Sequence, residues 1–181
     1  MYDMKNVIEQ DNTLVNLIAI IAILLVLLVT FRSLTLPVLL TVTIEAAIWI
    51  NLAFPYFSGN TLCYIGYLIL STVQLGATVD YAILLTTHYT ENRRTMTKKE
   101  ALQATMRESF SSILISGSIL SLSGFTLRFT SSNQIVSDLG LLLGRGTILS
   151  MLLVVFFLPA LLTLLDRLII KTTLRADFLK E

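Results

Sequence analysis

The apolar run TLVNLIAIIAILLVLLVTF, residues 13–31, decides the fold class of this chain. It carries no charged residue, and about 20 apolar residues in a helix cross the ~30 Å hydrocarbon core of a bilayer. Hydrocarbon offers no water to the backbone polar groups, so a spanning segment must bond them internally, as a helix does. Residues 13–31 therefore predict a transmembrane helix.

The rest of the chain is similarly apolar. Of its 181 residues, 55% are hydrophobic and 14% are charged, whereas soluble domains carry about 25% charged residues. Four more apolar runs are long enough to cross a bilayer, at about 34–57, 62–89, 109–129 and 138–165. We therefore predict an all-α integral membrane protein, with a five-helix transmembrane bundle over residues 13–170 and a cytoplasmic tail at 171–181.

The basic residues gather on one side of the predicted spans. Cytoplasmic segments of membrane proteins carry an excess of lysine and arginine, and an outside N-terminus assigns most of the 13 lysines and arginines to the cytoplasm. Only Lys5 and Arg128 then lie outside, and Arg145 falls within the fifth span. We predict that the N-terminus is outside and the C-terminus is cytoplasmic.

The loop at 90–108 is long enough to hold a helix of its own. Thr97 and Glu100 have the spacing of a capping box, and Leu102, Met106 and Phe110 follow at four-residue spacing. These features predict a short amphipathic helix on the cytoplasmic surface that leads into the fourth span. A solvated connector is favoured over a lipid-sensing role for this helix.

Small residues recur in the last two spans. Gly117, Ser121 and Gly124 share one face of the fourth span, and Gly140 and Gly144 are four residues apart in the fifth. Helices in lipid associate where small residues let their backbones approach. These residues therefore predict tight packing within the bundle.

The third span carries polar residues on two sides. At about 100° per residue, Gln74, Thr78 and Tyr81 form one stripe, whereas Gly76 and Asp80 point elsewhere. Asp80 and Tyr81 therefore need different partners, and Gly76 leaves space one turn from the carboxylate. A charge in hydrocarbon costs roughly 2.5–3.5 kcal/mol on insertion scales, and acids kept there commonly relay protons. A proton relay is favoured over a structural role for Asp80.

Glu45 and Arg145 allow more than one interpretation. At ~1.5 Å per residue, Glu45 lies within a few ångströms of the depth of Asp80, so one cavity is a candidate location for both acids. Arg145 has two candidate partners, Glu45 across the bundle and Asp138 on its own helix. Functional and structural roles are weighted equally for Glu45 and Arg145. His88 is interpreted as an interfacial residue, with proton entry as the lesser alternative.

Several classes of function are disfavoured. Cys63 is the single cysteine, which excludes an intrachain disulfide. One histidine and one cysteine, far apart, form no visible nucleophile–base pair or metal cluster, so we expect neither hydrolytic chemistry nor a metal or organic cofactor. The basic residues lie at membrane boundaries without interleaved aromatic residues, which argues against a nucleic-acid partner.

Two stretches carry a family resemblance that covers nearly the whole chain. GATVDYAILLTTHYTENRRTMTKKEALQATMRESFSSILISG, from Gly76, and LGLLLGRGTILSMLLVVFFLPALLTLLD, from Leu139, resemble the MMPL branch of the resistance-nodulation-division (RND) exporters. Gly76, Asp80 and Tyr81 look like the GxxxD-Tyr motif on the fourth helix of each half of such exporters. The resemblance implies that the five spans are helices two to six of one half, with residues 1–12 as the stub of an extracytoplasmic domain.

The resemblance also implies a function. Asp80 would carry the proton, the coupling ion, and Tyr81 would bond the equivalent acid of the other half, while lipids or other amphiphiles leave across the cell membrane. The expected partners are then the other half, the extracytoplasmic domains, the lipid bilayer and an amphiphilic substrate. The resemblance is also compatible with an oligomer. Alone, this chain is expected not to transport.

The alternative function is a lipid- or sterol-binding regulatory module. Sterol-sensing domains resemble helices two to six of the same fold. The Asp80–Tyr81 motif and the basic inner loop favour the exporter. A saturable site for a sterol photoprobe would favour the regulatory module.

Overall fold

In the computed structural model, the chain is described over residues 2–57 and 64–172, with side chains described for 14–54, 72–76 and 78–172. Every regular element within these ranges is helical. The elements, in chain order, are α1 (Tyr2–Phe31), α2 (Thr35–Phe57), α3 (Tyr64–Asn92), α4 (Lys98–Thr130), α5 (Gln134–Leu152), the π-helical segment η1 (Leu153–Phe157), α6 (Leu158–Leu164) and α7 (Asp166–Thr172).

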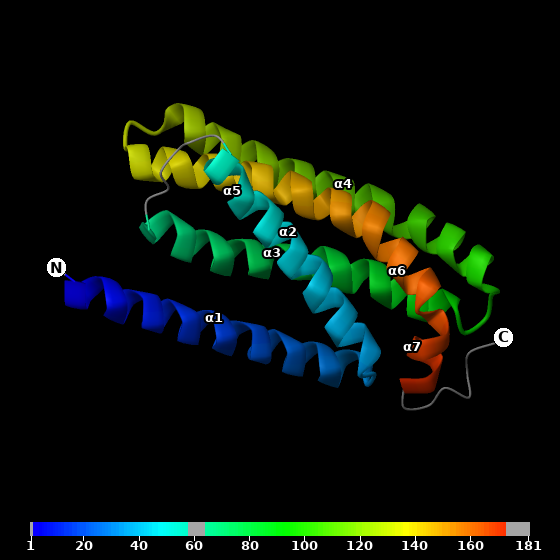
Figure 1. The fold of residues 1–181 in the computed structure, drawn as a ribbon. Coiled ribbons are helices and arrows are strands. Elements are labelled where there is room, and N and C mark those ends of the chain that lie inside the picture. Colours follow the sequence, from blue (N-terminus) through cyan, green and yellow to red (C-terminus); the bar gives the residue numbers. More distant parts are fainter. Residues whose placement is uncertain (1, 58–63, 173–181) are drawn as a thin grey trace.

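The connections between the long helices alternate between the two ends of the bundle (Figure 1). The turns after α1 and after α3 lie at the same end as α7, and the turn between α4 and α5 lies at the opposite end. The first turn contains Arg32, which has a left-handed backbone with φ 48°. The predicted cytoplasmic segments at 32–33, 90–108 and 166–172 therefore meet at one end.

Four helical segments are long and apolar enough to cross a bilayer in the part of the chain that the structure describes. They are Leu14–Phe31, Thr35–Phe54, Lys98–Thr130 and Gln134–Leu164. They confirm an all-α protein with several membrane-spanning helices. The predicted third span, 62–89, corresponds to α3 apart from residues 62 and 63, which lie outside the described residues. Its crossing of the membrane, the N-out orientation and the tail beyond residue 172 stay predictions.

Two of the predicted elements are joined or divided differently in the structure. The segment predicted as a short amphipathic helix leading into the fourth span forms the first turns of α4, which continues unbroken from Lys98 to Thr130. The predicted capping contact is present, because the Glu100 carboxylate accepts hydrogen bonds from the Thr97 amide (3.1 Å) and hydroxyl (2.8 Å). The fifth span consists of α5, η1 and α6 in succession. A π-helical turn of this kind inserts an extra residue into a helix and is frequent at functional sites.

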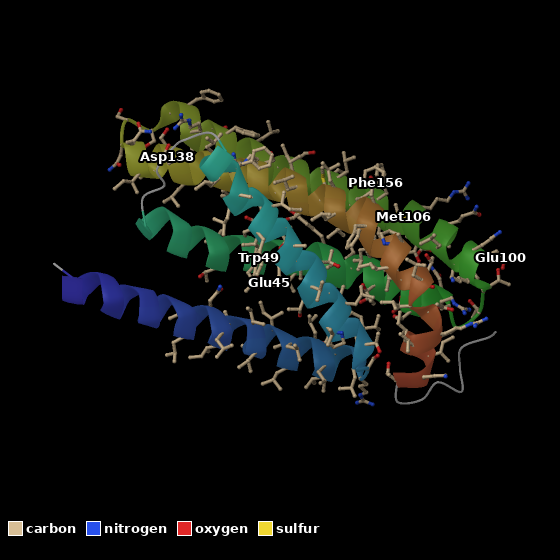
Figure 2. All side chains as sticks on the ribbon, in the orientation of Figure 1. Glu45, Trp49, Glu100, Met106, Asp138 and Phe156 are labelled. Carbon is tan, nitrogen blue, oxygen red and sulfur yellow. The ribbon has the colours of Figure 1, made fainter. Side chains whose placement is uncertain are left out.

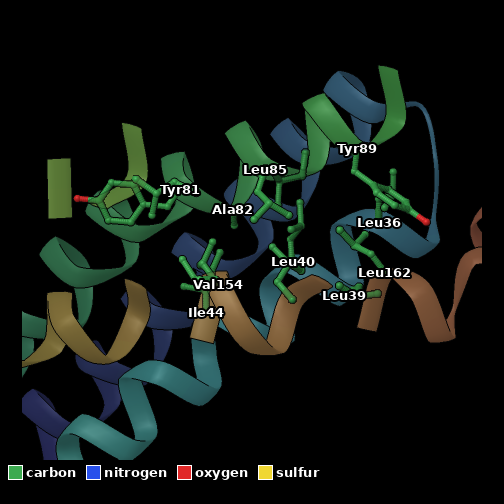
Figure 3. Packing of buried hydrophobic residues seen from close by; sticks show 14 of the residues in the cluster. Leu36, Leu39, Leu40, Ile44, Tyr81, Ala82, Leu85, Tyr89, Val154 and Leu162 are labelled. Atoms are coloured by element: carbon green, nitrogen blue, oxygen red, sulfur yellow. The ribbon is translucent and has the colours of Figure 1, made fainter. Parts of the chain in front are cut away.

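The apolar core lies where α2, α3, η1 and α6 meet (Figure 3). Leu40, Leu85 and Leu158 are completely buried there. In contrast, α1 packs against the bundle through its last turns, where Leu27 is buried. Only 6% of its apolar stretch, Leu14–Phe31, is buried, against 56% of the apolar stretch Thr35–Phe54 of α2. The side of α1 that faces away from α2 and α3 is therefore open to lipid or to another protein segment.

The helices α4 and α5 pack through the predicted small-residue faces. A methyl group added at Gly124 would lie 2.5 Å from the Gly144 nitrogen and 2.8 Å from the Gly140 oxygen. The Ser121 hydroxyl donates to the Gly144 carbonyl oxygen at 3.1 Å. The residues of α4 that are buried follow this seam and its continuation: Ala101, Thr105, Ser109, Ile113, Gly117, Ser121 and Gly124.

Candidate functional site

The two sides predicted for α3 are confirmed. Gln74 and Thr78 are each 1% exposed, and Tyr81 is 7% exposed within the apolar core. Asp80 and Gly76, in contrast, are exposed. A methyl group added at Gly76 would have no heavy atom within 4 Å. Asp80 and Tyr81, although adjacent in sequence, therefore face different surroundings.

The Asp80 carboxylate has no hydrogen-bond or ion-pair partner among the described residues. Its predicted depth places it inside the membrane, where an ionised carboxylate without a partner is costly. An exposed acid at this position can exchange a proton or bind a partner from outside the described bundle. Tyr81, in contrast, contributes its ring to the packing of α3 against its own bundle (Figure 3).

Glu45 lies half-buried on α2 and is bonded along its own helix. Its Oε2 accepts a hydrogen bond from Trp49 Nε1 at 3.2 Å, and Trp49 is 72% exposed. Figure 2 labels both residues on α2. No described residue forms an ion pair with Glu45. The structure therefore does not join Glu45 to Arg145, and no hydrogen bond links it to Asp80.

Arg145 takes neither of its two candidate partners. Its Nε donates to Asn51 Oδ1 at 2.9 Å, and Nη2 donates to the Asn51 carbonyl oxygen at 3.0 Å. Its guanidinium carbon lies 4.6 Å from the centre of the Phe54 ring. Asp138 is bound instead by Arg128, at 2.9 Å. The side chain that holds Arg145 is therefore a neutral amide of α2.

Asn51 and Gln74 form the centre of a buried network that joins α2, α3 and α5. Asn51 is completely buried, and its Nδ2 donates to Gln74 Oε1 at 2.8 Å and to the Leu142 carbonyl oxygen at 3.0 Å. Gln74 Nε2 lies 3.3 Å from the Ser150 hydroxyl and 3.4 Å from the Gly146 carbonyl oxygen. Asn51 was not among the site residues predicted from the sequence, although its position as an amide within an apolar span was an available signal.

A second buried cluster, also missed from the sequence, lies at the end of the bundle that holds α7. Arg93 donates to Asp166 from Nε (3.1 Å) and from Nη2 (2.8 Å), and the Tyr89 hydroxyl donates to the same carboxylate at 2.8 Å. All three residues are buried. Burial by itself raises the pKa of Asp166, but the hydrogen bonds from Arg93 and Tyr89 outweigh it and hold the pKa below its usual value. This cluster fixes α3 against α7.

A contact between two titratable side chains near this end joins α3 to α4. His88 Nδ1 lies 3.2 Å from Glu108 Oε2, which also accepts a hydrogen bond from Asn92 Nδ2 at 3.1 Å. The interpretation of His88 as an interfacial residue and its lesser alternative, proton entry, both stay predictions.

Metal-binding chemistry has no visible basis in the described part of the chain. No group of three or more His, Cys, Asp or Glu side chains is placed there to hold a metal ion.

Comparison with known proteins gives two matches. The model of the MMPL family matches residues 1–176. A protein of Streptomyces coelicolor named "Putative membrane protein ActII-3" is 30% identical over 144 residues, which cover 77% of this chain and 20% of that protein. The chain thus spans about a fifth of the length of this relative. The extent of the family match confirms the resemblance found in the sequence: the chain belongs to the MMPL family.

Proposed function

We propose that this chain is the transmembrane half-domain of an exporter driven by the proton gradient, with Asp80 as the proton carrier. The substrates are lipids or other amphiphilic compounds, and the protein is a multi-pass protein of the cell membrane. Membership of the MMPL family supports a transporter rather than an enzyme. The observation that carries the proposal is the exposed Asp80 carboxylate, which has no partner in the part of the chain that the structure describes.

The open space beside Gly76 supports the proposal that another helix packs against the Asp80 side of α3. Small residues on a transmembrane helix allow another helix to approach closely. The glycines of the α4–α5 seam, Gly124, Gly140 and Gly144, each meet the facing helix, whereas Gly76 meets nothing within 4 Å. We propose that a helix of the second half packs over Gly76 and brings a polar group to Asp80.

Tyr81 has a different task in this proposal. Because its ring is buried among core residues, Tyr81 holds the α3 helix in an orientation that keeps Asp80 on the exposed side. The bond from Tyr81 to an acid of the other half stays a prediction. The extracytoplasmic domains are further proposed partners, and this chain alone is expected not to transport.

The test is Asp80→Asn in the full-length gene product, assayed in inverted membrane vesicles. Asparagine keeps the shape of the side chain but cannot carry a proton. We expect proton-driven accumulation of a fluorescent amphiphile to be lost, with normal insertion and helix content. Asp138→Asn is the matched control, since Asp138 is bound by Arg128 beside the turn between α4 and α5 and is not assigned to the relay. Normal accumulation with Asp80→Asn would refute the proton-carrier role.

A further inference from the structure

Arg145 is a cation whose contacts among the described residues are all with neutral groups. Its two hydrogen bonds go to the side-chain oxygen and the backbone oxygen of Asn51, and its third contact is the face of Phe54. None of these groups carries a negative charge. The acids that the sequence offers as partners are placed elsewhere, because Asp138 pairs with Arg128 and Glu45 is bonded by Trp49.

The orientation of the guanidinium is set in advance by a buried scaffold. Asn51 is 0% exposed and Gln74 is 1% exposed, and the two amides bond each other and α5. Gly146 has no room for a side chain, since a methyl group there would collide with the amides of both Asn51 and Gln74. Three helices therefore hold Arg145 in one position, as a binding group requires.

The guanidinium keeps donors that the described chain does not use. Arginine has five N–H donors in a planar fork, and the hydrogen bonds to Asn51 use one at Nε and one at Nη2. Arg145 is partly exposed, so the donors that remain can reach a molecule outside the bundle. A planar cation of this kind matches carboxylate and phosphate oxygens in a two-point contact.

The location favours an amphiphile over a small free anion. Arg145 lies eleven residues into α5, about 16 Å along the helix from Gln134, and helical side chains lean toward the N-terminal end. The neighbouring exposed side chains are apolar, with Phe54 at 43% and Ile148 at 37% exposure. An anion at this depth is accompanied most favourably by a hydrocarbon chain, which such side chains accommodate.

We propose that Arg145, held by Asn51, binds the carboxylate or phosphate headgroup of an anionic amphiphile that enters from the lipid. This inference rests on the proposed exporter function and narrows its substrate class to amphiphiles with an acidic headgroup. It also explains why the fifth span contains a charged residue, since an arginine without a compensating partner is costly inside a membrane.

The binding test uses the 181-residue chain in phosphatidylcholine nanodiscs, which contain no competing anionic lipid. The probe is palmitic acid with a photoactivatable diazirine, at alkaline pH, compared with its methyl ester. We expect saturable labelling by the acid and no saturation by the ester. Lysophosphatidic acid should displace the probe and inorganic phosphate should not. Equal labelling by acid and ester, or displacement by inorganic phosphate alone, would overturn the proposal.

Substitutions locate the site. Arg145→Met should weaken binding of the acid at least about tenfold, as expected from the loss of a charge-assisted contact. Arg145→Lys keeps the charge without the planar fork, so binding should fall between the two. Arg107→Met, at an exposed arginine near the start of α4, is the matched control and should bind as the unmodified chain does. Unchanged labelling of Arg145→Met, folded by circular dichroism, would contradict the site.

Asn51→Asp keeps the test decisive if Arg145→Met fails to fold. This substitution is nearly isosteric and supplies Arg145 with a carboxylate from its own bundle. We expect the helix content to be kept and binding of the acid to be lost, because the internal carboxylate competes with the headgroup. Retained binding in a folded Asn51→Asp chain would refute the proposal.

Asp80→Asn separates this inference from the exporter function. It should abolish proton-driven transport and leave probe binding at Arg145 unchanged. If transport by the full-length protein persists while acid and ester label equally, the headgroup site is wrong and the exporter assignment still stands. If binding is as expected but Asp80→Asn transports normally, the proton-carrier role is wrong and the headgroup site still stands.

Discussion

The two sides of α3 treat polar residues in opposite ways. On the inner side, Gln74 is hydrogen-bonded to α2 and α5, and the Tyr89 hydroxyl donates to the Asp166 carboxylate of α7. On the outer side, Asp80 is exposed and without a partner among the described residues, and Gly76 faces open space. One helix thus carries polar groups that are bonded within their own bundle and an acid that the described residues leave without a partner.

The difference separates structural polar residues from those assigned to function. A buried polar group that is fully bonded within its own chain holds helices in register, and its removal leaves partners unsatisfied. A polar group that the chain leaves unbonded in a membrane must be bonded by something else. The inner side therefore maintains the bundle, and the outer side is where we expect the proton and the second half.

Among the substitutions on the inner side, we expect Asp166→Asn to cause the largest loss of stability. Removing the carboxylate takes away the charged group that bonds the buried Arg93 guanidinium, and breaking a buried pair costs about 3–5 kcal/mol. The free energy of unfolding in mixed detergent micelles, followed by circular dichroism, should fall by this amount. Asp138→Asn is the control, because the Arg128–Asp138 pair is one-third exposed and should cost about 1 kcal/mol or less. Equal losses would contradict the assignment.

Gln74→Leu and Asp80→Asn compare the two sides of α3 directly. The leucine removes the acceptor of Asn51 Nδ2 and the donor to Ser150, so the chain should lose about 1–3 kcal/mol. Asp80→Asn breaks no described contact and should leave the free energy of unfolding within about 0.5 kcal/mol. The same unfolding assay measures both. A larger loss for Asp80→Asn would mean that its side of α3 is already occupied in this chain.

Gly76→Ala should produce a smaller effect of opposite sign. A methyl group at Gly76 meets nothing within 4 Å, and alanine is favoured over glycine in helices by up to about 1 kcal/mol. The 181-residue chain should therefore become slightly more stable, while export by the full-length protein decreases because the second half cannot approach. Gly146→Ala, which meets buried amides, should destabilise the chain instead. Undiminished export by Gly76→Ala would argue against close packing there.

The smallest expected effect is the change of stability with pH. Because the pKa of Asp166 is lowered in the folded chain, its ionised form stabilises the fold above the unfolded pKa of about 3.9. This contribution is lost as the pH falls through the lower folded pKa. The midpoint of thermal unfolding should be steady above about pH 5 and fall below pH 4. The decrease should be smaller in Asp166→Asn, and an identical decrease would assign the acid sensitivity to other groups.

Several features of this protein followed from the sequence alone. Runs such as residues 13–31 require helices because a bilayer leaves backbone groups no other partner. The period of an α-helix placed Gln74 and Thr78 opposite Gly76 and Asp80, and the four-residue spacing of small residues predicted the seam at Gly124 and Gly144. Each of these inferences needs only one segment and its surrounding medium.

Only the tertiary structure decided which polar groups meet. The sequence offered Glu45 and Asp138 to Arg145, and the fold gave it Asn51, 94 residues away. It likewise brought Asp166 to Arg93, 73 residues apart. Pairing across helices depends on the rotation and depth of each helix relative to its neighbours, which side-chain packing sets and no periodicity within a single segment can supply. Asp80, which this packing leaves without a partner among the described residues, is the acid to which we assign the proton.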